Sequence, residues 1–71
     1  GRSSRALAIY DRWLEREPDD IDMRVRRALV LRQKGGLSQA LGELNHAVAT
    51  EPDNTFARYS LIETLLVAGR A

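Results

Sequence analysis

The sequence contains no cysteine, only two prolines, a single histidine and few aromatic residues. The absence of cysteine excludes disulfide bonds and thiolate metal sites, although it does not separate cytoplasm from periplasm as a location. A zinc site normally needs three or four protein ligands, and no matching spacing of side chains surrounds His46. We therefore predict no metal site.

Excess charge and long apolar runs are also missing. The net charge is +1 over 71 residues, which gives the whole molecule no field that would draw it onto nucleic acid or an anionic membrane. Charged residues interrupt every apolar stretch well before the ~20 residues that a membrane-spanning helix needs. Ten of the eleven basic residues are arginine, a bias typical of GC-rich bacterial genomes. We expect a bacterial chain, in cytoplasm or periplasm, with no membrane span.

What the sequence has instead is an internal repeat with a period of 34 residues. Such a period is a signature of stacked helical repeats. Gly1, Gly35 and Gly69 recur at this spacing, with no insertion between them. Other aligned pairs are Ala6 and Ala40, Leu7 and Leu41, Glu17 and Glu51, Pro18 and Pro52, Asp19 and Asp53, and Leu31 and Leu65.

The aligned residues predict where helices begin and end. Pro18 and Pro52 cannot continue a helix, because proline lacks the amide donor and clashes with the preceding turn. The Asp and Asn residues that follow each proline are good N-caps for the next helix. Gly35 and Gly69 are expected to end helices by adopting a left-handed backbone. The predicted helices cover about residues 4–17, 21–34, 38–51 and 55–68.

Apolar residues follow the helical period and not the period of two that a strand shows. In the first predicted helix they form one stripe on an otherwise polar helix, and the third helix repeats the pattern. The residues predicted to pack between helices are Ala6, Leu7, Tyr10, Trp13, Ala28, Leu31, Ala40, Leu41, Leu44, Ala47, Leu61 and Leu65. Trp13 is interpreted as filling the gap between adjacent helices. Asp19, Asp20 and Asp22 are interpreted as capping residues and not as a calcium site.

The small residues Ala28, Ala40 and Ala47, together with Leu44 and Pro52, resemble the tetratricopeptide repeat (TPR) family over essentially the whole chain. The resemblance implies an all-α fold of four helices, in which antiparallel helix pairs form a right-handed superhelix. It divides the chain into the second helix of a partial repeat (1–20), one complete repeat (21–54) and the first helix of a further repeat (55–71). A segment of a longer bacterial array is implied.

Two arginines depart from the family pattern. Arg24 and Arg27 stand where the family usually has large apolar residues. The fold tolerates them because an arginine stem can lie over apolar surface while its charge stays in water.

The resemblance also implies a partner-binding groove, lined by the first helix of each repeat. The groove residues are Val25, Arg26, Leu29, Arg32, Gln33, Phe56, Tyr59 and Glu63. Arg26 and Arg32 would hold carboxylates of an acidic or C-terminal peptide by forked hydrogen bonds, and Phe56 and Tyr59 would supply apolar anchors. Alternatively, Arg26 pairs with Asp22 one turn earlier and the surface is merely solvated. The lysines and asparagines of the family's clamp for chaperone tails are absent.

A second candidate binding surface is the most basic part of the chain, which contains Arg24, Arg26, Arg27, Arg32 and Lys34. Such a cluster can contact the phosphates of nucleic acid or an acidic surface. A helix turns by ~100° per residue, however, so these side chains should point in several directions. No aromatic residues interleave with them as a base-stacking platform requires. A solvated face is favoured over nucleic-acid binding.

Catalysis has little support in the sequence. The four serines have no histidine base in an obvious arrangement, and Gly35–Gly36 lacks the lysine and serine of a phosphate-binding loop. We expect no enzyme, no cofactor and no small-molecule substrate, but a scaffold that binds a protein or peptide. A structural spacer within a larger enzyme or envelope-secretion protein is the alternative. The apolar last helix also predicts self-association through the terminal helices.

Overall fold

The computed structural model describes residues 1–70. Over this range the chain forms four α-helices and no strand. They are α1 (Arg2–Arg16), α2 (Ile21–Gln33), α3 (Leu37–Thr50) and α4 (Thr55–Arg70). The all-helical prediction is confirmed, and each helix boundary lies within two residues of the predicted one.

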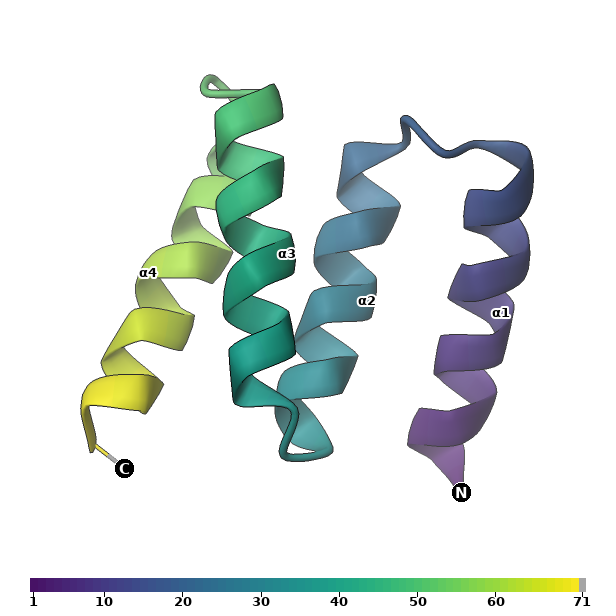
Figure 1. The fold of residues 1–71 in the computed structure, drawn as a ribbon, viewed down its shortest axis with the longest axis horizontal. Helices are drawn as coiled ribbons and strands as arrows, with labels where there is room; N and C mark the ends of the chain where they lie inside the picture. The colour runs from purple at the N-terminus through teal and green to yellow at the C-terminus, as the bar shows by residue number, and fades with distance from the viewer. Residues whose placement is uncertain (71) are drawn as a thin grey trace.

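Consecutive helices pack side by side and run in alternating directions (Figure 1). In addition α2 packs against α4, and these two helices run in the same direction. The molecule is a slab of 33 × 31 × 15 Å. Helices α1 and α4 lie at its opposite ends (Figure 1). Each of them therefore has helical neighbours on one side only.

The turns between α1 and α2 and between α3 and α4 are built alike. The Asp20 carboxylate accepts a hydrogen bond from the Met23 backbone N–H at 3.1 Å. At the equivalent place in the second turn, Asn54 Oδ1 accepts from the Ala57 backbone N–H at 3.0 Å. Each side chain satisfies an amide that the first helical turn leaves without a partner. The predicted caps are confirmed, at the second residue after each proline.

The turn between α2 and α3 depends on Gly35, whose φ is +92°. The Gly36 N–H donates to the Leu31 carbonyl at 2.8 Å, and the Gly35 N–H donates to the Arg32 carbonyl at 3.1 Å. This is the paired hydrogen-bond pattern of a helix end that needs a left-handed residue. The matching prediction for Gly69 is wrong, because α4 continues through it to Arg70. Glycine permits a left-handed backbone but does not impose one.

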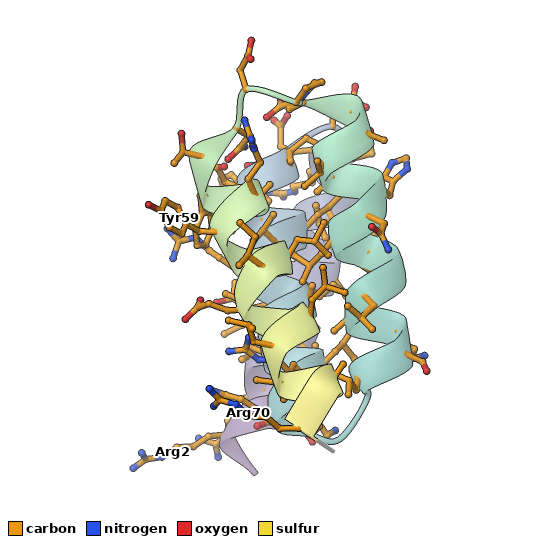
Figure 2. All side chains as sticks on the ribbon, turned by 90° about the vertical axis from the view of Figure 1, so that its left-hand side faces the viewer. Arg2, Tyr59 and Arg70 are labelled. Atoms are coloured by element: carbon orange, nitrogen blue, oxygen red, sulfur yellow. The ribbon has the colours of Figure 1, made fainter. Side chains whose placement is uncertain are left out.

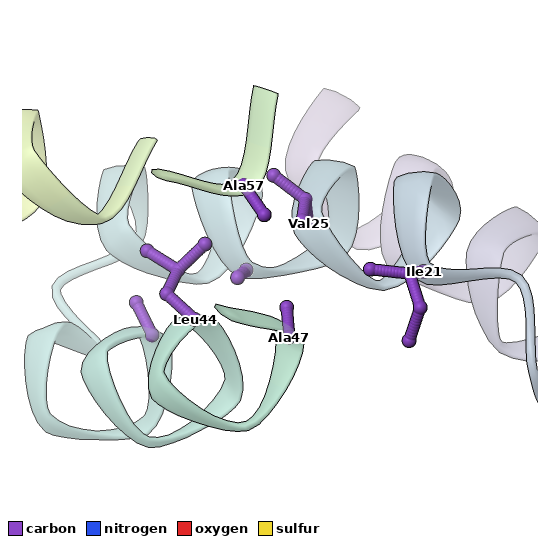
Figure 3. Packing of buried hydrophobic residues seen from close by; sticks show 7 residues of the cluster. Ile21, Val25, Leu44, Ala47 and Ala57 are labelled. Carbon is purple, nitrogen blue, oxygen red and sulfur yellow. The ribbon is translucent and has the colours of Figure 1, made fainter. Parts of the chain in front are cut away.

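Seven buried apolar residues form the core, and Figure 3 shows them packed between α2, α3 and α4. They are Ile21, Val25, Ala28, Ala40, Leu44, Ala47 and Ala57. Within Arg2–Arg16, no side chain is fully buried. Because alanines make up most of this core, the backbones of neighbouring helices can approach closely, and a larger residue would force them apart.

The residues predicted to pack between helices fall into three groups. Ala28, Ala40, Leu44 and Ala47 are fully buried. Ala6, Leu7, Tyr10, Leu31, Leu41 and Leu61 are half-buried. Trp13 and Leu65 are exposed, on the two terminal helices. Among the residues predicted to pack, the fully buried ones thus all lie on α2 and α3, which have helices on both sides.

Candidate functional site

The predicted groove residues lie on the neighbouring helices α2 and α4. Asp22, Arg26, Leu29 and Gln33 recur at intervals of three and four along α2, so they share one helix face. Phe56 and Glu63 share a face of α4 because they are seven residues apart. Since the two helices run in the same direction side by side, these faces can form one continuous surface, which we name the α2–α4 surface.

Arg26 and Phe56 connect the two helices on this surface. The guanidinium carbon of Arg26 lies 5.4 Å from the centre of the Phe56 ring. Such a cation–π contact is worth about 0.5–1 kcal/mol at an exposed site. A cation–π contact uses the charge of the guanidinium and not its N–H hydrogens, so these can still donate to an incoming carboxylate. Asp22, the alternative partner considered for Arg26, instead accepts a hydrogen bond from Asn54 Nδ2 at 2.9 Å.

Arg32 forms a hydrogen bond with a residue of the neighbouring helix. Its Nη1 donates to Thr64 Oγ1 at 3.0 Å, which joins α2 to α4. Thr64 is buried, and its hydroxyl donates in turn to the Ser60 carbonyl at 2.7 Å. A buried hydroxyl needs such partners, because leaving it unpaired costs about 1–3 kcal/mol. Arg32 therefore holds the two helices together and is less suited to capturing a partner than the sequence suggested.

The remaining predicted groove residues differ in exposure. Val25 is fully buried, and Figure 3 shows it beside Ala57 in the core. Leu29 is half-buried and packs against the core. Gln33 and Glu63 are exposed. The exposed part of the predicted groove thus lies around Arg26, Phe56 and Glu63.

Tyr59 lies at the edge of this surface. It is exposed, and its side chain projects away from the helices in Figure 2. Its helical position, three residues after Phe56 and four before Glu63, places it on the same side of α4 as these two residues. Tyr59 therefore forms the exposed rim of the α2–α4 surface.

An ion-pair network that the sequence did not reveal links three helices on another side of α2. Arg27 Nε lies 2.6 Å from Asp11 Oδ1 of α1, and its Nη1 lies 3.6 Å from Glu43 Oε1 of α3. Arg24 Nη1 lies 3.9 Å from Glu43 Oε2, and its Nε donates to the Pro18 carbonyl at 2.8 Å. One signal in the sequence could have revealed this network. Arg24 and Arg27 stand where the family usually has apolar residues, and the helices on both sides of α2 carry acidic residues.

The five cations considered as a nucleic-acid surface do not form one stripe. Arg24 and Arg27 reach towards α1 and α3, while Arg26 and Arg32 reach towards α4. Lys34 Nζ lies 3.4 Å from a serine hydroxyl of α1. This spread follows from the turn of the helix between successive residues.

Trp13 and Asp20 form a further contact. The indole Nε1–H of Trp13 donates to Asp20 Oδ2 at 2.8 Å, so one carboxylate caps α2 and also holds α1. Trp13 keeps an exposed ring face on the outer side of α1, where it lines a shallow hollow with Ile9, Arg12 and Arg16. It thus joins two helices by a hydrogen bond at the edge of the molecule.

The described chain shows neither a metal centre nor a membrane helix. Across residues 1–70, no three His, Asp or Glu side chains gather closely enough to hold a metal ion. His46 is exposed and lies beside Thr50, 3.5 Å from its hydroxyl. Of the helices in this range, none combines the length and apolar character required to cross a membrane.

Comparison with known proteins gave no relatives. A scan against protein-family models, a search of curated proteins and a search of solved structures each found no match.

Proposed function

We propose that this chain is a protein-binding segment of the TPR type, in which antiparallel helix pairs repeat along a right-handed superhelix. Three features support this proposal. The helix boundaries follow the 34-residue period, the two proline-containing turns share the same capping arrangement, and each helix packs on the next. In such repeats every unit contacts only its neighbours, which leaves an extended surface available to a partner.

The proposed binding site is the α2–α4 surface. The observation that carries this assignment is the exposed Arg26, whose guanidinium lies over the Phe56 ring. This contact restricts the long arginine side chain, so less conformational entropy is lost when a ligand binds. Aromatic and arginine side chains also dominate the binding energy of many protein interfaces.

The chemistry of the surface indicates the kind of partner. Arg26 suits a carboxylate, either an acidic side chain or the C-terminus of a peptide. Phe56 offers an apolar ring edge beside it, and Glu63 discourages a second acidic group further along α4. We expect a protein or peptide segment with one carboxylate next to an apolar residue. The proposed role requires no catalysis, cofactor or small-molecule substrate.

Peptide selection tests the proposal. Peptides that bind the chain would be selected from a random library, and their Kd measured by fluorescence anisotropy against single variants. Both Arg26→Ala and Phe56→Ala should weaken binding at least about tenfold, because loss of an interface anchor costs more than ~1.4 kcal/mol.

Arg5→Ala is the control of matched charge, since Arg5 is an exposed arginine on α1. The Kd of the selected peptides for the Arg5→Ala variant should equal their Kd for the unmodified chain. Selected peptides that bind the Arg26→Ala and Phe56→Ala variants as tightly as the parent would refute the assignment.

A further inference from the structure

The two terminal helices carry exposed apolar residues at opposite ends of the molecule (Figure 1). On α4 these include Tyr59, Ile62 and Leu65, and on α1 they are Ile9 and Trp13. Exposed apolar side chains gathered on one helix face are a mark of an interaction surface. The 34-residue repeat shows which buried face of the molecule is equivalent to each of these exposed faces.

The exposed residues of α4 align with buried residues of α2. Tyr59 is 65% exposed, whereas Val25, 34 residues earlier, is 0% exposed. Ile62 is 54% exposed, whereas its counterpart Ala28 is 0% exposed. The difference arises because α3 and α4 cover α2, while the described chain places no further helix on the outer side of α4.

The outer face of α1 aligns with a buried face of α3 in the same way. Trp13 is 44% exposed, whereas Ala47, 34 residues later, is 0% exposed and belongs to the core. Ile9 aligns with Glu43, which reaches across to Arg24 and Arg27 of α2. The outer face of α1 is thus the counterpart of the face that α3 presents to α2.

By these correspondences, the open face of α4 is equivalent to the α2 side of the α2–α3 interface. The open face of α1 is equivalent to the α3 side of the same interface. The chain packs α3 on α2, and by the repeat an α1 can pack on an α4 in the same way. One chain cannot make this contact with itself, because its α1 and α4 lie at opposite ends of the slab. A second copy of the chain carries the complementary face.

We propose that copies of this chain associate head to tail, with α1 of one copy packed on α4 of the next. Ile62 and Leu65 then contact Ile9 and Trp13 of the neighbouring copy, whose α2 lies beside Tyr59. Trp13 and Ile62 are larger than the alanines with which they align, so the copies stand farther apart than α2 and α3 do. Because the contact joins two different surfaces, it leaves one face open at each end and continues into rings or filaments.

Blocking each face separately tests the proposal by sedimentation velocity. Ile9→Glu places a charge on the α1 face, and Ile62→Glu places one on the α4 face; both residues are exposed, so the fold of a single copy is retained. The unmodified chain should form species of rising size as its concentration increases. Each variant alone should remain a monomer, and an equimolar mixture of the two should give a pair of chains and nothing larger.

Ala49→Glu, at an exposed position of α3, is the matched control and should associate as the unmodified chain does. Circular dichroism of each variant verifies that its helix content is unchanged. An unmodified chain that stays monomeric at high concentration overturns the proposal. Dimers of the Ile9→Glu variant alone, which would indicate α4-to-α4 packing, also overturn it, as does a mixture of the two variants that remains monomeric.

Discussion

At the scale of single residues, several polar side chains each hold two helices. Asp20 caps α2 and accepts the indole N–H of α1. Arg27 joins α1 to α3 through Asp11 and Glu43, and Arg32 joins α2 to α4. Because the apolar core is small, these contacts add to the packing that holds neighbouring helices together.

The Asp20→Ala substitution tests this at the residue with two different partners. It removes the cap of α2 and the acceptor of Trp13, so we expect a loss of about 1–2 kcal/mol in the free energy of unfolding. Urea unfolding followed by circular dichroism measures the loss, and Trp13 fluorescence should change in the folded state. Asp19→Ala is the neighbouring control, at an exposed position, and should stay within ~0.5 kcal/mol of the parent. Equal effects of the two substitutions would show that Asp20 has no special role.

At the scale of helices and turns, local chemistry determines most of what is observed. The prolines, the Asp and Asn caps and Gly35 act within a few residues of themselves, and for this reason the helix boundaries could be predicted from the sequence. The prediction for Gly69 is wrong because glycine permits a left-handed backbone without imposing one, and α4 continues through Gly69 to Arg70. The same residue type is thus required at one position and merely tolerated at another.

Two glycine substitutions should have opposite effects on stability. Gly35→Ala forces a side chain onto a backbone with φ of +92° and should destabilise the chain by about 1–2 kcal/mol. Gly42 lies within α3, where an added Cβ meets no atom within 4 Å. Gly42→Ala should therefore stabilise the chain by about 0.5–1 kcal/mol. Thermal unfolding of both variants measures the difference, and shifts of the same sign would contradict the assigned roles.

Close helix packing can be tested with a matched pair of substitutions on α3. Ala47 is fully buried in the core, so Ala47→Leu should overpack it at a cost of about 1–3 kcal/mol. Ala49 is exposed on the same helix, and Ala49→Leu should change stability by less than ~0.5 kcal/mol. Urea unfolding of the two variants makes the comparison. If Ala47→Leu is as stable as Ala49→Leu, the helices do not pack as closely as described.

At the scale of the whole molecule, the position of α4 decides which predicted groove residues are exposed. The resemblance to the repeat family assigned Val25, Arg26 and Arg32 of α2 to the predicted groove. It did not reveal that α4 covers Val25 and accepts a hydrogen bond from Arg32, because helix periodicity does not specify where a neighbouring helix lies. The contact of Arg26 with Phe56 joins residues 30 positions apart, counted from 26 to 56, so it too depends on how the helices pack.

The most direct test of partner binding at the α2–α4 surface is a nuclear magnetic resonance titration of the ¹⁵N-labelled chain with a selected carboxylate-bearing peptide. The backbone amide signals of Arg26, Phe56 and Glu63 should shift most, while those around Arg24, Arg27 and His46 should stay in place. Shifts concentrated around Arg24, Arg27 and His46, or spread evenly over all four helices of residues 1–70, would contradict binding at this surface.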